Sequence, residues 1–262
     1  MKRRVDVLLV QKGFVGSRSQ ARDLIKLKRV VVNGKICEKP GEVVSDDSNI
    51  QLLKPRHYVS RGAEKLEKAY LAFGMDFNNK VVCDIGASKG GFTQFAIEHG
   101  ARKVYAIDVG SNQLADSLRC DSRVISLEHF NARYLSPDKI GEQVDIVLCD
   151  VSFISVRLLL KAINSVLKEN GAALFLIKPQ FETGRFIAQS KECHSKVIDE
   201  IFHDSALQGL FACDLTYSPI TGSDGNIEYL AYFSKSRPNV TVDNERIVRV
   251  VEQAWSVFRG EQ

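Results

Sequence analysis

The chain has 262 residues, 44% of them hydrophobic, and a formal net charge of +4. A chain of this length and apolar content can bury a sizeable core, either as one large domain or as a small domain plus a medium one. No apolar run approaches the roughly 18 residues that a bilayer span requires, and the N-terminus lacks the pattern of a secretion signal. We therefore expect a soluble cytoplasmic protein with no membrane partner.

The positive charge is concentrated near the N-terminus. Residues 1–60 hold 13 Lys/Arg and 6 Asp/Glu, whereas residues 61–262 hold 23 and 26. A basic module suits a phosphate-bearing partner, because released counterions supply most of the non-specific affinity. The alternative is a solvated surface without a partner. The six cysteines show neither a C-x-x-C pair nor a zinc-like spacing with histidine, so we expect free thiols and no metal.

The first 53 residues predict two helices followed by a hairpin. Apolar residues from Val5 follow helical spacing up to Gly13, and Ser17 can cap a second helix. Ala21, Leu24, Ile25 and Lys28 form the expected inward stripe of that helix. Asn33-Gly34 is a strong hairpin signal, and residues 49–53 supply a further strand.

This arrangement resembles the RNA-binding module first seen in ribosomal protein S-four. The resemblance covers about residues 4–52, and its most specific part is SRSQARDLIKLKRVVVNGK. It implies that Arg4, Arg18 and Arg22 contact RNA phosphates. The alternative is that these arginines only keep the module soluble.

The remainder of the chain predicts an α/β domain. Pro55 disfavours helix before it, and a helix beginning near Ser60 and Glu64 carries Lys65 in its first turns. Strand-like and helix-like segments then alternate up to a helix over 195–209, which predicts a mostly parallel sheet covered on both faces. Two antiparallel strands and a final helix follow. We therefore predict an RNA-binding domain at 1–54, a linker at 55–60 and a Rossmann-like domain at 61–262.

A glycine-rich turn follows the first strand of this domain. The turn reads G-x-x-x-G-G rather than the G-x-G-x-x-G of dinucleotide sites. An acidic Asp84 before it suits a donor with an amino group and a sulfonium, namely S-adenosylmethionine, and Asp108 after the next strand suits ribose hydroxyls. A structural turn and a helix N-cap are the respective alternatives. The predicted donor-binding residues are Asp84, Gly86, Ala87, Ser88, Gly90, Gly91, Phe92, Asp108 and Val109.

Three further polar residues lie at expected strand ends. Asp150 ends the fourth strand, at the edge where open α/β sheets bind ligands, although it could instead cap a helix near Ser155. Lys178 follows an apolar strand, where burial should make its proton easier to lose, unless the side chain reaches solvent. Glu228 enters a later strand and needs a buried partner, for which Lys178 and Lys65 are candidates.

Six motifs together closely resemble the TlyA family, which is often labelled hemolysin. They are SRGAEKL, DIGASKGGFT, AIDVG, CDVSFIS, LIKPQFE and SPITGSDGNIEYL, in matching order over nearly the whole chain. The resemblance implies an S-four-type domain joined to an FtsJ-like methyltransferase that modifies cytidine 2′-hydroxyls in large-subunit and, in some members, small-subunit ribosomal RNA. It also implies a catalytic tetrad of Lys65, Asp150, Lys178 and Glu228. Residues 56–59 look like the interdomain linker of the longer, dual-substrate members.

The chain departs from the family pattern at Lys89, at Ser111-Asn112 and over residues 187–199. None of these changes touches the tetrad. Because the ribose of a structured RNA is reached by flipping out the nucleotide, Arg61, Arg133 and Phe153 are candidates to hold the target. Two alternative functions are a non-catalytic RNA-binding assembly factor and a membrane-lytic protein, and the sequence lacks the cationic amphipathic helix that lysis would need.

Overall fold

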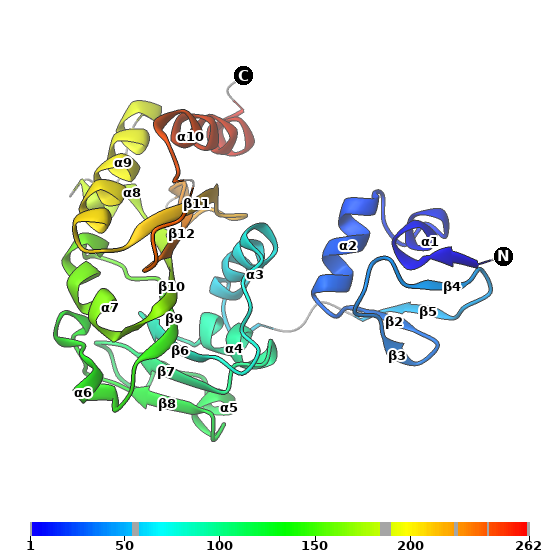
Figure 1. Ribbon diagram of the computed structural model, residues 1–262, viewed down its shortest axis with the longest axis horizontal. Coiled ribbons are helices and arrows are strands. Elements are labelled where there is room, and N and C mark those ends of the chain that lie inside the picture. The colour runs from blue at the N-terminus through cyan, green and yellow to red at the C-terminus, as the bar shows by residue number, and fades with distance from the viewer. Residues whose placement is uncertain (1, 54–57, 184–189, 223–224, 240, 261–262) are drawn as a thin grey trace. The chain divides into compact units, whose positions relative to one another are not determined.

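The computed structural model describes residues 2–53, 58–183, 190–222, 225–239 and 241–260. Its internal contacts divide the chain into two units, Met1–His57 and Tyr58–Gln262. Figure 1 labels the elements of both. The boundaries expected from the sequence, at residues 54 and 61, fall on either side of this division. Residues 54–57, which include part of the expected linker, lie outside the described residues.

The first unit packs two helices against short antiparallel strands. Strands β2, β3 and β5 form one sheet in the order β3-β2-β5, and β1 pairs with β4 in another. Leu8, Leu9 and Ile25 of the helices pack with Val30 in one buried core. The elements are β1 Lys2–Arg4, α1 Val5–Gln11, α2 Arg18–Lys26, β2 Val30–Val32, β3 Lys35–Ile36, β4 Val43–Ser45 and β5 Ile50–Leu52.

Short-range sequence features explain where most helices and strands of this unit begin and end. Ser17 accepts a hydrogen bond from the backbone N–H of Gln20 and so begins α2. Asn33 and Gly34 both have positive φ, which is the backbone that a two-residue hairpin turn requires. The inward position expected for Lys28 is wrong. Helix α2 ends at Lys26, and Lys28 is exposed in a left-handed conformation, while Leu27 is buried instead.

The second unit is built on a seven-stranded sheet in the order β11-β12-β10-β9-β6-β7-β8. Neighbouring strands from β10 to β8 are parallel, and β12 and β11 add an antiparallel edge. The strands are β6 Val81–Ile85, β7 Lys103–Ile107, β8 Val124–Leu127, β9 Val144–Cys149, β10 Leu167–Ile177, β11 Phe211–Tyr217 and β12 Tyr229–Ser234. The longer helices are α3 Gly62–Phe73, α4 Gly91–Glu98, α7 Leu160–Val166, α9 Lys191–Leu207 and α10 Asn244–Arg259. Shorter helical turns are α5 Asp116–Arg119, η1 Ala132–Tyr134, α6 Pro137–Ile140, η2 Val156–Leu159 and α8 Pro179–Glu182.

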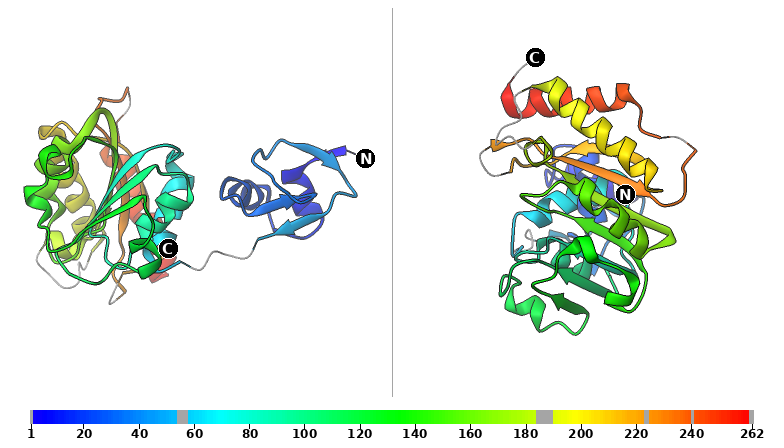
Figure 2. Two further views of the ribbon diagram at one scale, coloured as in Figure 1. Left: turned by 90° about the horizontal axis from the view of Figure 1, so that it is seen from below. Right: turned by 90° about the vertical axis from the view of Figure 1, so that its left-hand side faces the viewer.

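Helices cover both faces of this sheet, as Figures 1 and 2 show. Val81, Cys83 and Ile85 point to the face that packs against α7, α9 and α10 in one large core. Asp84 points the other way and accepts a hydrogen bond from Thr93 of α4. The predicted α/β class is confirmed: this is a Rossmann-like sheet. Alternation of side chains along β6 explains how one strand serves two helical layers.

Two element boundaries differ from expectation. The helix expected to continue to about residue 170 ends at Val166, and β10 begins at Leu167, with a register shift before Ala172. Helix α9 begins at Lys191 rather than 195, because Ser190 accepts a hydrogen bond from the Cys193 N–H. Within the part of the chain that the structure describes, no helix has the length and apolar content of a membrane span.

Candidate active site

Neighbouring strands of the sheet bring the predicted polar residues to one edge. Asp150 follows β9 and Lys178 follows β10, and these strands are parallel neighbours. Strand β6, which leads into Gly86, lies on the other side of β9. Asp108 follows β7, the next strand in the order. The carboxyl ends of four adjacent strands therefore supply the glycine turn and three of the candidate side chains, where open α/β sheets bind ligands.

Lys178 and Asp150 form a largely buried ion pair. The Lys178 Nζ lies 2.7 Å from Asp150 Oδ1, with 9% and 19% of the two side chains exposed. The same ammonium donates to Ser152 Oγ at 2.8 Å. Lys178 thus does not reach for solvent, and Asp150 does not cap the helical turn after it; Ser155 does so by accepting from the Arg157 N–H. One hydrogen-bond direction of Lys178 is thus fixed by Ser152, and the Asp150 carboxylate lies at ion-pair distance from the same nitrogen.

A second buried ion pair joins α3 to the start of β12. Lys65 Nζ lies 2.6 Å from Glu228 Oε2, with 10% and 3% of the side chains exposed. The partner required by Glu228 is therefore Lys65 rather than Lys178. Gly222 packs directly on this carboxylate, because a Cβ at Gly222 would overlap Glu228 Oε1.

Strand register relates the two pairs. In the antiparallel ladder of β10 and β12, Ile177 is paired with Tyr229. Lys178 and Glu228 are the next residues along each strand, so continuing the register by one step places them opposite each other. Directly opposed residues have Cβ atoms about 5 Å apart. The four residues of the predicted tetrad thus form two separate ion pairs, Lys178 with Asp150 and Lys65 with Glu228, and Lys65 and Glu228 lie outside both pocket linings.

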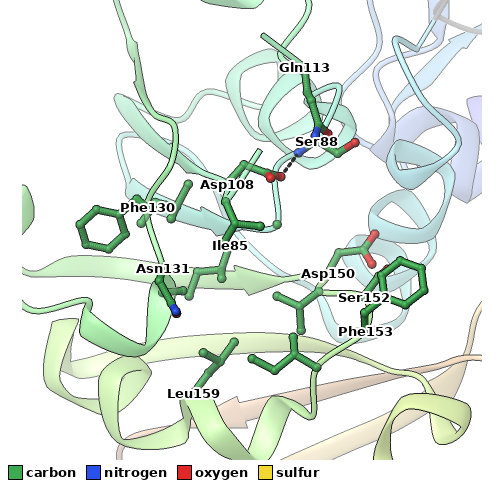
Figure 3. Close-up of a pocket in the computed structure, with 16 residues that line it drawn as sticks. Ile85, Ser88, Asp108, Gln113, Phe130, Asn131, Asp150, Ser152, Phe153 and Leu159 are labelled. Atoms are coloured by element: carbon green, nitrogen blue, oxygen red, sulfur yellow. Dashed lines mark hydrogen bonds between the residues drawn. The ribbon is translucent and has the colours of Figure 1, made fainter. Parts of the chain in front are cut away.

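Two adjoining pockets lie along this edge, with volumes of about 350 and 190 Å³. The larger, shown in Figure 3, is lined by apolar side chains together with Asp108 and Asn131. The smaller is polar and includes Asp84 and Lys178. The residues common to both are Gly86, Ser88, Asp150 and Ser152. A ligand with an apolar ring at one end and a charged group at the other would fit this continuous groove.

Asp84 has an unusual environment at the bottom of the smaller pocket. Its Oδ2 accepts a 2.6 Å hydrogen bond from Thr93, while its buried Oδ1 has no hydrogen-bond partner among the described residues. Burial raises the pKa of this carboxyl to about 7, and nearby Asp150 acts in the same direction. A ligand group that donates a hydrogen bond would satisfy this oxygen. The ammonium of an amino-acid moiety is such a donor.

Asp108 also faces the groove. One carboxylate oxygen accepts from the backbone N–H of Ser88 (Figure 3). The other accepts from the backbone N–H of Gly110, and each bond is 2.8 Å long. These bonds hold the carboxylate against the glycine turn and leave a lone pair on each oxygen for ribose hydroxyls.

The glycines of the turn are required mainly by neighbouring protein atoms. Gly86 and Gly90 have positive φ, and a Cβ at Gly86 would overlap the Asp150 carbonyl oxygen. At Gly90 it would meet Leu114 and Leu118, and at Gly91 it would meet Ser60. The sharp turn expected from the sequence is present. Contacts with protein atoms, rather than with a ligand, therefore exclude a larger residue at these three glycine positions. Gly90 lies outside both pocket linings, which include the other predicted donor-binding residues Asp84, Gly86, Ala87, Ser88, Gly91, Phe92, Asp108 and Val109.

The residues proposed to hold a target nucleotide are exposed around the groove. Phe153 is 86% exposed with a positive φ of 63°, lines the larger pocket and lies 5.0 Å from the Phe181 ring. Arg61 precedes α3, next to pocket residues Ser60 and Gly62. Arg133 follows the pocket residues Asn131 and Ala132. A bulky residue with positive φ at a pocket mouth is strained, and such strain concentrates at functional sites.

In the first unit the three predicted RNA-binding arginines share one partner. Arg4, Arg18 and Arg22 each form an ion pair with Asp6, whose carboxylate is fully buried. Asp6 was not singled out in the sequence. Its only sequence signal is its place in the first turn of a helix directly after Arg4.

Several pocket residues were also missed. Phe130 and Asn131 follow β8 and line the larger pocket, and Ser152 contacts Lys178. Extending the strand-end rule to β8 would have pointed to Phe130 and Asn131. Glu182 accepts hydrogen bonds from Ser155 Oγ and the Val156 N–H, which ties the loop after β9 to α8. Nothing in its sequence position distinguishes it.

The description "FtsJ-like methyltransferase" belongs to the family model that matches residues 58–235, and an S4 domain model matches residues 3–50. This chain belongs to the FtsJ-like methyltransferase family. The 16S/23S rRNA (cytidine-2′-O)-methyltransferase TlyA of Mycobacterium tuberculosis is 37% identical over 87% of this chain and 88% of its own. Hemolysin A of Brachyspira hyodysenteriae is 40% identical over 88% and 99%. The chain is thus a TlyA-type member of the FtsJ-like family, as its motifs predicted.

Solved structures agree with this FtsJ-like assignment. A hemolysin-named structure from Streptococcus thermophilus has a TM-score of 0.74 and 39% identity, covering 99% of this chain and 98% of its own. A more distant S-adenosylmethionine-dependent methyltransferase from Mesorhizobium loti has a TM-score of 0.50 at 14% identity, covering 66% of this chain and 97% of its own. The latter shows a shared fold alone. In the described ranges, no group of three or more His, Cys, Asp or Glu side chains is arranged to hold a metal ion.

Proposed function

We propose that this protein methylates a cytidine 2′-hydroxyl of ribosomal RNA with S-adenosylmethionine as donor. Large-subunit RNA is the first candidate substrate and small-subunit RNA the second. The observation that carries the proposal is the Lys178–Asp150 ion pair in a groove that also contains the Asp84 and Asp108 carboxylates. Relatives with these two substrate classes in their names, and the S4 domain, support RNA as the acceptor.

The groove fits the proposed donor. The larger, apolar pocket takes the adenine, with Phe130 and Asn131 beside it, and Asp108 accepts from the ribose hydroxyls. Asp84 Oδ1, unpartnered among the described residues, accepts from the amino group of the methionine moiety. When bound, S-adenosylmethionine supplies an electrophilic methyl group on a sulfonium. An activated donor of this kind needs an aligned nucleophile rather than a metal.

Lys178 is the proposed base. The 2′-hydroxyl is a weak acid, and proton transfer requires a base within hydrogen-bond reach. Ser152 accepts a hydrogen bond from the Lys178 amine and Asp150 holds it as an ion pair, and Lys178 lines the smaller pocket where the ribose would enter. The hydroxyl proton passes to Nζ as the new O–C bond forms and the methyl group leaves sulfur. Lys65 and Glu228 position the end of β12 opposite Lys178.

The target nucleotide would stack on Phe153. Its ring is exposed beside Phe181 at the mouth of the groove, and base–aromatic stacking is the common way to hold an unstacked base. Arg61 and Arg133, which are exposed and next to pocket residues in the chain, would contact the flanking phosphates. Crosslinks from bound RNA confined to other surfaces of this unit would contradict this placement.

Two measurements on the full-length protein test the function. Calorimetric titration should show binding of S-adenosylmethionine, and 2′-O-methyl mapping of ribosomal RNA from cells with and without the protein should reveal a cytidine mark that depends on it. RNA binding without donor binding would favour a non-catalytic assembly factor. Leakage of liposomes caused by the pure protein would favour the membrane-lytic alternative.

A further inference from the structure

Three arginines of the first unit converge on one buried carboxylate. Arg4 is the residue before α1, Asp6 lies in the first turn of α1, and Arg18 and Arg22 are one turn apart on α2. Arg4 Nε lies 3.0 Å from Asp6 Oδ1, Arg18 Nη2 lies 2.9 Å from Oδ2, and Arg22 Nε lies 3.4 Å from Oδ2. One carboxylate thus joins two helices and the strand before them through guanidinium groups.

The partners differ sharply in exposure. The Asp6 side chain is fully buried, whereas 47% of Arg4 and 50% each of Arg18 and Arg22 remain accessible. Hydrogen bonds from Arg4 hold the pKa of Asp6 well below its usual range, although burial opposes them. Asp6 therefore stays ionised over the physiological range of pH. A guanidinium has five donor hydrogens, so most donors of the three arginines are not used by Asp6.

The Asp6 carboxylate offsets the electrostatic repulsion among the three arginines. Three guanidinium groups placed side by side repel one another, and each long side chain loses rotamer freedom when it is held. The buried Asp6 carboxylate reduces this repulsion and holds the three guanidinium groups in place. Because it carries one negative charge against three positive ones, the cluster keeps a net charge of +2. Preorganised, forked donors around an excess positive charge match the oxygens of a phosphate better than three independent mobile side chains would.

We propose that Arg4, Arg18 and Arg22 act together as a single clamp for one RNA phosphodiester, and that Asp6 is its positioning residue. This inference rests on the proposed function, because it takes RNA as the partner. It goes further in assigning a role to an acidic residue within an RNA-binding surface. It also states that the arginines are coupled rather than additive.

The decisive variant is Asp6→Asn in the full chain. It preserves the shape of the side chain and raises the net charge by one, so charge alone predicts tighter RNA binding. The clamp predicts the opposite, a loss of roughly tenfold in affinity, as expected for one mispositioned charge-assisted contact. The matched control is Asp46→Asn, which changes the charge of the same unit equally but removes the 3.0 Å partner of Arg3 outside the cluster. The control should bind RNA at least as tightly as the unaltered protein.

Charge-conserving variants separate positioning from folding. Arg4→Lys, Arg18→Lys and Arg22→Lys retain the charge but lose the fork, and each should weaken binding by a similar factor. The triple variant should be little worse than any single one, because a clamp broken once is already lost. Only variants with an unaltered melting temperature are compared. Additive losses, or no loss, would overturn the proposal.

The salt dependence of the RNA-binding constant reports how many phosphates the protein neutralises. With in-vitro-transcribed large-subunit ribosomal RNA as the probe, the slope of log K against log salt should fall by about 0.7–0.9 for the single and the triple neutral Arg→Gln variants alike. Three independent contacts would lower the triple slope by about two units or more. In methylation assays Asp6→Asn should raise the RNA KM and leave kcat unchanged. A variant that instead loses only affinity for phosphatidylglycerol vesicles would contradict RNA as the partner.

The proposed methylation of ribosomal RNA and the proposed arginine clamp would be refuted by different results. If the unaltered protein does not bind or methylate this RNA, the proposed function fails. If it does both, and Asp6→Asn behaves like Asp46→Asn, only the clamp is refuted.

Discussion

Lys178 directly follows Ile177 and Glu228 directly precedes Tyr229, and Ile177 and Tyr229 are partners in the antiparallel ladder of β10 and β12. Each forms its ion pair with a different element, Lys178 with Asp150 after β9 and Glu228 with Lys65 of α3. The proposed tetrad therefore consists of two buried ion pairs at the adjacent ends of β10 and β12. Disruption of one pair is expected to affect chemistry, and disruption of the other mainly the position of β12.

Replacing Lys178 with Met should abolish methylation and leave donor and RNA binding within about twofold. Methionine keeps the length of the side chain but removes the proposed base, and loss of a positioned base costs about 10²–10⁴ in rate. Single-turnover methylation, together with calorimetric donor binding, checks this. Near-normal turnover of the variant would refute the assignment of Lys178 as the base.

Glu228→Gln should destabilise the protein by about 3–5 kcal/mol, because it leaves the Lys65 ammonium buried without a counter-charge. The double variant Lys65→Met with Glu228→Gln should recover most of this loss, since no buried charge remains. Urea denaturation monitored by circular dichroism measures both. If the double variant regains stability but not activity, the pair positions the site. If the single variant is as stable as the unaltered protein, the pair is not buried in solution.

Donor affinity should increase as pH rises from about 6 to 8. Burial raises the pKa of Asp84 to about 7, so the carboxylate that accepts from the donor ammonium is fully formed only above that pH. The folded protein binds this proton more tightly than the unfolded chain, whose carboxyl titrates near 3.9. Stability without donor should therefore fall as pH rises from about 4 to 7. Asp84→Asn should remove both trends, and calorimetry with thermal denaturation across this range tests them. Identical pH profiles for the two proteins would contradict the role.

Glu182→Gln should reduce kcat by about tenfold. Glu182 is partly buried and accepts from Ser155 and the Val156 N–H, so it fixes the loop that carries Asp150 and Ser152. The neutral amide weakens these charge-assisted bonds by about 1 kcal/mol or more. The control is Glu192→Gln at an exposed position of α9, which should match the unaltered enzyme. An unchanged kcat with a raised donor KM would place Glu182 in donor binding instead.

The sequence alone indicated the class of fold and the donor turn, and its family motifs supplied the four residues of the proposed tetrad. Alternating apolar strands and helices specify a parallel sheet, because side chains must be buried on both faces of each strand. Residues at the ends of those strands then reach one edge regardless of how far apart they lie in the chain. Asp84, Asp108, Asp150 and Lys178 could be found in this way, and the family motifs supplied Lys65 and Glu228.

Only the tertiary structure decided which partners these residues have. Sequence reasoning left Glu228 with two candidate lysines, and the approach of α3 to β12 selected Lys65. It placed three arginines on one surface but missed that Asp6 binds them all. Ser152 and Glu182 were missed because a hydroxyl or carboxylate in a loop acquires its role only from the segment packed against it. Periodicity in the chain fixes which face a residue takes, whereas ion pairs depend on distances between elements that no local pattern encodes.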